Sequence, residues 1–159
     1  MLEKALIAIL GAAALATAGA GGYALAGEQT ATREALAGTD NAVGAPGKTL
    51  GLSRVTIPAG VRLGLHRHAG TQVAYIDAGT LTYTVKTGDV RVTKGPLDGK
   101  HKVVKTIRAG QTGTIPQGTW VVEQPNVVHF AENKTSKPIV ILLSTLFPIG
   151  APPSIPVDE

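Results

Sequence analysis

Three histidines form the part of this chain whose residue types and spacing most directly indicate chemistry. His66 and His68 are separated by one residue, and His129 lies far downstream. Side chains alternate between the two faces of a β-strand, so His66 and His68 are expected to point to the same side. Two imidazoles on one face, joined by a third from a distant strand, can hold a divalent metal. The alternative is that these histidines are surface residues of a glycine-rich loop.

One further side chain is a candidate for the same site. Glu123 is a candidate for a catalytic acid–base group or an extra ligand. The alternative for Glu123 is an exposed position at a strand edge. An imidazole-rich site leaves the metal open among Zn, Cu, Mn, Fe and Ni.

Short β-type segments separated by glycine and proline would position these residues. Almost no helical periodicity is present, and the segments recur at the spacing of an all-β antiparallel sandwich or barrel. The expected strands cover residues 50–57, 61–66, 72–76, 81–86, 90–93, 103–107, 113–115, 120–123, 127–131 and 139–146.

The two ends of the chain are expected to lie outside the barrel domain, which spans residues 49–147. Residues 1–26 have a weakly basic start, an apolar run and a small-x-small sequence, which predict a signal peptide cleaved near Ala26. Cleavage would make the protein periplasmic or secreted, and an uncleaved membrane anchor is the alternative. Residues 27–48 are predicted to be a flexible linker with one helical turn at 32–37. The proline-rich residues 148–159 are predicted to be an extended surface tail.

Composition excludes several classes of function. The chain has 159 residues, no cysteine and a formal net charge of +4. Disulfides, thiolate metal ligands and cysteine nucleophiles are therefore excluded. Lys and Arg are scattered, without the blocks of like charge that a nucleic-acid-binding arm carries, so no nucleic-acid partner is expected.

The spacing around the first two histidines resembles the first motif of the cupin superfamily. That motif has a glycine, an His-x-His pair, an acid and a second glycine. Gly60, His66, His68 and Gly79 fall at the corresponding offsets, while Gln72 takes the place of the acid.

The second cupin motif is also recognisable. Gly118, His129 and Asn133 match it, whereas Gln124 replaces its proline and Asn126 its second glycine. Because both motifs occur in register, the likeness is much more specific than an isolated His-x-His pair, and it covers roughly residues 49–146.

The resemblance implies an antiparallel double-stranded β-helix, or jelly-roll barrel, of the cupin type. It also implies that His66, His68 and His129 bind one divalent transition metal. By the same resemblance Gln72 would supply a neutral amide oxygen as a fourth ligand, or else not ligate at all. Because an amide takes up no proton at useful pH, Gln72 can only ligate or orient. The expected function is dioxygenase-like activity on a small oxygen-donor substrate. A non-catalytic cupin that binds or senses a metal or a small ligand is the alternative, and a purely structural barrel is a third. A homodimer sharing a sheet fits the resemblance, and membrane contact is expected only through an uncleaved N-terminus.

Overall fold

The computed structural model describes residues 29–158, and its regular elements are all β-strands. Every segment predicted as a strand is one. In chain order the strands are β1 (Thr32–Asp40), β2 (Lys48–Ile57), β3 (Arg62–Arg67), β4 (Thr71–Ala78), β5 (Thr80–Thr87), β6 (Asp89–Lys94), β7 (Lys102–Arg108), β8 (Thr112–Pro116), β9 (Thr119–Glu123), β10 (Val128–Glu132), β11 (Ile139–Pro148) and β12 (Ile155–Pro156).

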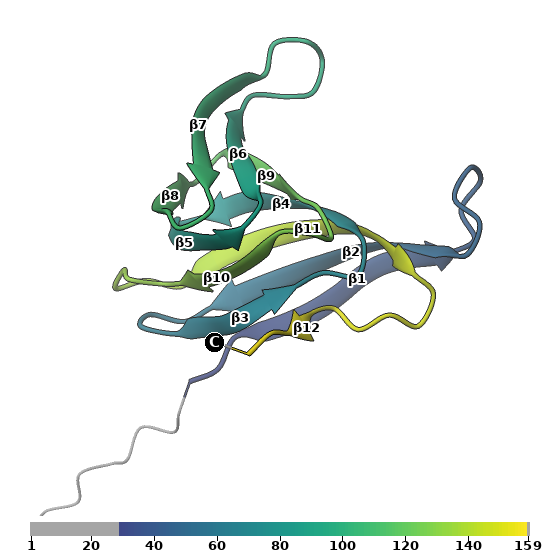
Figure 1. Cartoon of the computed structure of the whole chain (residues 1–159), viewed down its shortest axis with the longest axis horizontal. Helices are drawn as coiled ribbons and strands as arrows, with labels where there is room; N and C mark the ends of the chain where they lie inside the picture. Colours follow the sequence, from purple (N-terminus) through teal and green to yellow (C-terminus); the bar gives the residue numbers. More distant parts are fainter. Residues whose placement is uncertain (1–28, 159) are drawn as a thin grey trace, which may run out of the picture.

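The strands form two antiparallel sheets that enclose the core (Figure 1). The larger sheet has seven strands in the order β1-β2-β11-β4-β9-β6-β7, and the smaller has five in the order β12-β3-β10-β5-β8. Strands that neighbour each other in a sheet are mostly far apart in sequence, as in a jelly roll. The predicted fold class, an all-β antiparallel barrel, is confirmed.

Strand alternation builds the core between the sheets. In β4 the side chains of Gln72, Ala74 and Ile76 are buried, while Val73 and Tyr75 between them are more exposed. The same alternation in the other central strands places aliphatic side chains from both sheets in one hydrophobic cluster. The same face of β4 therefore carries core residues, Ala74 and Ile76, and the candidate ligand Gln72.

A tight turn links β4 in the larger sheet to β5 in the smaller sheet. Gly79 joins them with a φ of 85°, a conformation that glycine adopts without steric cost. A Cβ atom on Gly79 would also lie 2.9 Å from Cγ1 of Ile139. The turn thereby positions two strands that carry residues of the site, Gln72 on β4 and Tyr83 on β5.

Both ends of the described chain join the sheets, which the sequence did not predict. Residues 32–37 were expected to form a helical turn within a linker, but they belong to β1, which pairs with β2 from Thr32 opposite Thr56 to Asp40 opposite Thr49. The alanine, leucine and glutamate in this segment favour a helix weakly. Pairing with the free edge of β2 overrides that preference. The proline-rich tail likewise forms β12, which pairs with β3.

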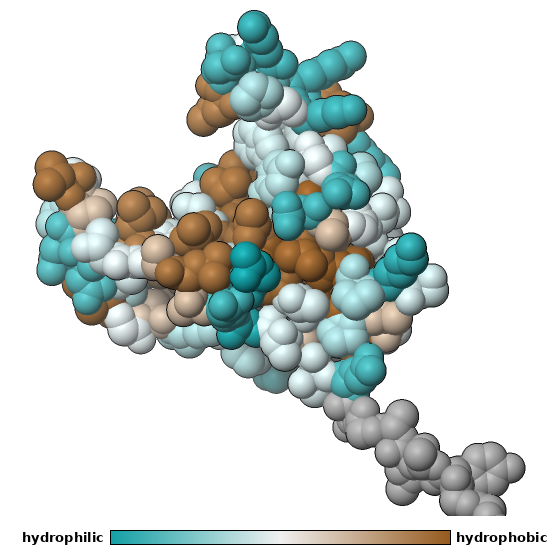
Figure 2. All heavy atoms as spheres, turned by 180° about the vertical axis from the view of Figure 1, so that it is seen from behind, coloured by the Kyte–Doolittle hydropathy of each residue, from teal (hydrophilic) through white to brown (hydrophobic). Residues whose placement is uncertain are grey.

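Apolar side chains also gather on the outer surface, as Figure 2 shows from behind. Leu50, Leu52, Val73, Tyr75 and Leu146 are exposed on β2, β4 and β11, with Leu50 opposite Leu146 across the β2–β11 pair. The homodimer expected from the resemblance stays a prediction.

The predicted signal peptide, residues 1–26, lies outside the described residues. Within residues 29–158, no helix has the length and apolar character needed to cross a membrane.

Candidate metal centre

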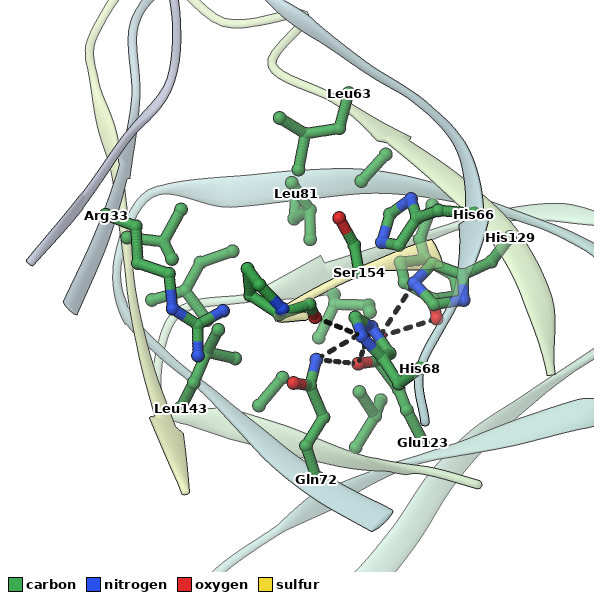
Figure 3. Close-up of a pocket in the computed structure, with 18 of the residues that line it drawn as sticks. Arg33, Leu63, His66, His68, Gln72, Leu81, Glu123, His129, Leu143 and Ser154 are labelled. Atoms are coloured by element: carbon green, nitrogen blue, oxygen red, sulfur yellow. Dashed lines mark hydrogen bonds and ion pairs between the residues drawn. The ribbon is translucent and has the colours of Figure 1, made fainter. Parts of the chain in front are cut away.

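The three predicted histidines converge inside the barrel (Figure 3). His66 on β3 lies directly opposite His129 on β10 in the register of that strand pair. His68 follows the end of β3, in the turn that leads to β4 in the other sheet. One potential ligand atom from each of the three side chains lies within 4.8 Å of the other two. The structure therefore assembles the trio that the sequence spacing predicted.

Each of these imidazoles directs its Nδ1 atom at a main-chain carbonyl oxygen. Because a carbonyl only accepts, Nδ1 carries the hydrogen, and the lone pair is left on Nε2. A metal-binding histidine is commonly held in this way by a hydrogen bond from its other nitrogen. The Nδ1 to oxygen distances are 2.7 Å from His66 to Gly64, 2.9 Å from His68 to Pro153, and 3.3 Å from His129 to Val127.

Glu123 lies beside two of the imidazoles and is buried. Its Oε2 is 3.3 Å from Nε2 of His68, and its Oε1 is 3.4 Å from Nε2 of His129. The hydroxyl of Tyr83 donates a hydrogen bond to Oε1 at 2.6 Å. Of the two positions considered for Glu123, the structure has the pocket carboxylate and not the exposed strand edge.

Gln72 on β4 is paired in register with Glu123 on β9. The Gln72 amide nitrogen donates a hydrogen bond to Oε2 of Glu123 and lies 3.0 Å from Nε2 of His68. A carboxylate accepts hydrogen bonds, so the amide nitrogen and not the amide oxygen faces this group. Oε1 of Gln72, the atom expected to ligate, is buried without a hydrogen-bond partner among the described residues. The oxygens beside the imidazoles are those of Glu123.

Burial and the neighbouring groups set the ionisation of the cluster. Burial lowers the pKa of His129 to about 4, although the nearby Glu123 acts in the opposite direction. Burial alone would raise the pKa of Glu123, but His129, His68 and the hydrogen bond from Tyr83 outweigh it and hold this pKa well below its usual range. At neutral pH the centre thus combines a carboxylate with a neutral His129 imidazole, a donor set that favours a cation.

A cavity of about 410 Å³ adjoins the cluster. Its walls are mainly aliphatic, with side chains from both sheets, and the C-terminal segment closes part of it through Pro153, Ser154 and Pro156. The charged side chains in its lining are Arg33 and Glu123. The volume lies in the usual range for a small-molecule site.

Solved structures identify the architecture. A cupin superfamily protein from Desulfitobacterium hafniense is 15% identical and superposes with a TM-score of 0.51, covering 77% of this chain and 82% of that one. A cupin 2 domain-containing protein from Halorhodospira halophila is 14% identical, with a TM-score of 0.52 over 84% of this chain and 77% of that one. This chain has the cupin fold. No protein-family model and no curated protein sequence matches it.

The residues at the centre fit a divalent transition metal. The Nε2 atoms of the three imidazoles and the carboxylate of Glu123 form a set of nitrogen and oxygen donors. This set suits Zn, Cu, Fe or Ni, and also Mn when the carboxylate contributes. No Lys ammonium or Arg guanidinium is paired with Glu123 among the described residues. The charge of the carboxylate is therefore available to a metal ion.

Three other ring-bearing residues lie in or near the described pockets. Tyr83 packs in the hydrophobic core, lines the cavity and donates its hydrogen bond to Glu123. Trp120 is half-buried, donates a hydrogen bond to the carbonyl oxygen of Gly95, and lines a second pocket together with His101, apart from the cavity beside the histidines. His101, the fourth histidine, is exposed, and its ring centre lies 6.1 Å from that of Trp120.

Sequence reasoning missed Arg33 and the C-terminal segment as parts of the cavity. The inward orientation of Arg33 follows from the pairing of β1 with β2, which the sequence did not reveal. The hydrogen bond between His68 and Pro153 joins residues distant in the chain. The abundance of proline in the tail indicated only an extended segment.

Proposed function

We propose that this cupin binds one divalent transition metal through Nε2 of His66, His68 and His129, and a small molecule in the adjoining cavity. The observation that carries the proposal is the convergence of the three imidazoles, each with its Nδ1 atom at a main-chain carbonyl. That arrangement fixes the tautomer with Nε2 unprotonated and orients the ring before a metal arrives.

Glu123 completes the centre in this proposal. Its two oxygens lie 3.3 and 3.4 Å from imidazole nitrogens. Ligands that share one metal at about 2.1 Å have similar separations between their donor atoms. Gln72 then acts as a positioning residue, because its amide nitrogen binds the carboxylate. The carboxylate reduces the net charge of the bound ion and strengthens its retention.

The cavity supplies the small-molecule part of the function. Its aliphatic walls would remove water from a bound molecule, and a metal held beside them would polarise an oxygen donor of that molecule. Dioxygenase-like turnover of a small oxygen-donor substrate is the catalytic form of the proposal.

The non-catalytic form, a cupin that binds or senses its ligand, is favoured by one observation. Both oxygens of Glu123 already accept hydrogen bonds, one from Tyr83 and one from Gln72. A carboxylate held in this way is suited to binding a metal and is poorly placed to move a proton to or from a substrate.

Elemental analysis tests the metal site. The protein, purified without chelators, is compared with a His66→Ala/His129→Ala double variant and with His101→Ala as the matched control. We expect close to one metal per chain in the parent and in the control, and loss in the double variant. Absence of metal from all three, or equal metal in the double variant, would overturn the proposal.

Turnover then separates the two forms of the function. Oxygen uptake is measured with a panel of enols and flavonols under air, before and after removal of the metal. Metal-dependent uptake supports the dioxygenase-like form. Ligand binding without uptake supports the binding or sensor form.

A further inference from the structure

Arg33 is a positively charged side chain that lines the cavity beside the histidines. It lies on β1 opposite Val55 of β2, whose side chain belongs to the core, and it lines the cavity. The adjacent Glu34 belongs to the opposite side of the strand and binds Arg54 at 2.8 Å. Among the described residues, the Arg33 guanidinium takes part in no hydrogen bond or ion pair, so its donors are available to a molecule in the cavity.

This free guanidinium lies at the boundary between the cavity and solvent. Arg33 is an exposed residue whose guanidinium is partly shielded by the cavity wall; this desolvation lowers its pKa, yet an arginine keeps its charge at all ordinary pH values. A charge that is partly removed from water and unpaired costs free energy, which an anion at the same place would offset. The other charged group of the lining, Glu123, is negative and already hydrogen-bonded.

Arg33 and the histidines lie on opposite sides of the cavity (Figure 3). β1 is separated from β4, the strand of Gln72, by β2 and β11. Three strand spacings therefore separate β1 from β4, which is about 14 Å measured along the sheet. Aliphatic residues that include Leu63, Leu81 and Leu143 line the space between. A molecule that reaches both sides therefore needs an apolar middle.

We propose that Arg33 binds the carboxylate of a small, mostly apolar acid whose other end, an oxygen donor, lies against the histidine cluster. The part concerning that other end rests on the proposed function, whereas the part concerning Arg33 does not. The planar guanidinium matches a carboxylate through two parallel hydrogen bonds, a geometry that a lysine could not reproduce. The cavity of about 410 Å³ limits the acid to a small molecule.

Calorimetric titration with matched pairs tests the inference. The probes are hexanoate, octanoate, 3-phenylpropanoate and 3-(4-hydroxyphenyl)propanoate, each beside its uncharged primary amide. At least one acid is expected to bind about 10-fold more tightly than its amide, the usual size of one charge-assisted interaction. The preference should vanish in Arg33→Gln and persist in Arg54→Gln, the control arginine whose partner is Glu34.

The outcomes separate this inference from the metal proposal, because metal content is measured on the same samples. No binding of any acid, equal binding of acid and amide, or a preference that survives in Arg33→Gln overturns the inference. If the preference for acid over amide survives in Arg33→Gln but disappears when the metal is removed, the carboxylate binds the metal ion, and the metal proposal stands. An Arg33-dependent preference in a protein that binds no metal would support the inference and contradict the metal proposal.

Discussion

Gln72 and Glu123 lie directly opposite each other on β4 and β9, and the Gln72 amide nitrogen donates a hydrogen bond to the Glu123 carboxylate. The cupin motif has an acid at the position of Gln72. In this chain the acid is instead on the neighbouring strand, at the paired position. The pair therefore still places one carboxylate at the site, and the other residue of the pair positions that carboxylate through a hydrogen bond.

Exchanging these two residues tests that relationship. Glu123→Gln should weaken metal binding by about 10- to 100-fold, because the centre loses its carboxylate. The double variant Gln72→Glu/Glu123→Gln should recover most of the affinity, since it restores a carboxylate and an amide donor at the same two positions. Competition with a chelator of known affinity gives the measurement. A double variant no better than Glu123→Gln would show that the two positions are not equivalent.

The C-terminal segment should contribute to metal affinity through His68. Nδ1 of His68 lies 2.9 Å from the carbonyl oxygen of Pro153, a main-chain atom that no side-chain substitution removes. A chain ending after Gly150 should therefore bind metal about 10- to 100-fold more weakly. A chain ending after Val157 retains Pro153 and β12 and serves as the control. Equal affinities in the two truncated proteins would exclude this role for the tail.

Tyr83→Phe should destabilise the metal-free protein. The substitution leaves a buried carboxylate oxygen without the hydroxyl donor that lies 2.6 Å away. We expect a loss of about 1–3 kcal/mol in the free energy of unfolding, measured by urea denaturation. Tyr75→Phe is the matched control, because Tyr75 is exposed on the outer face of the barrel. A loss in Tyr83→Phe no larger than in the control would contradict the importance of this hydrogen bond.

We propose that the chain is exported and cleaved near Ala26. The proposal rests on the apolar run and the small residues that precede Gly27. Mass spectrometry of the protein recovered from its producing cells should give the mass of a chain that begins at or near Gly27. An intact N-terminus on membrane-bound protein would instead support the anchor.

The three histidines could be predicted because each is marked by a pattern of residues close to it in the sequence. His66 and His68 share a strand face by parity, and the downstream motif supplied His129. Glycines such as Gly79 marked turns that the structure requires. The alternation of apolar residues in the central strands likewise predicted an all-β barrel, because each of these strands has one face in the core.

The sequence could not predict contacts that depend on long-range register. Glu123 faces Gln72 only because β4 pairs with β9, and no local pattern encodes that pairing. Arg33 was missed because every residue of β1 is exposed, so the strand has no alternating pattern to recognise. The tail was interpreted as a surface segment because its two-residue strand, β12, is too short to leave a periodic signal.

The proposed metal centre can be tested by locating a bound ion in a crystal. A crystal of the metal-loaded protein is measured with X-rays on both sides of the metal's absorption edge, which locates the ion by anomalous scattering. We expect one peak about 2.0–2.2 Å from Nε2 of His66, His68 and His129, with an oxygen of Glu123 beside it. An ion found elsewhere, for instance at His101, or no ion in protein exposed to excess metal, would contradict it.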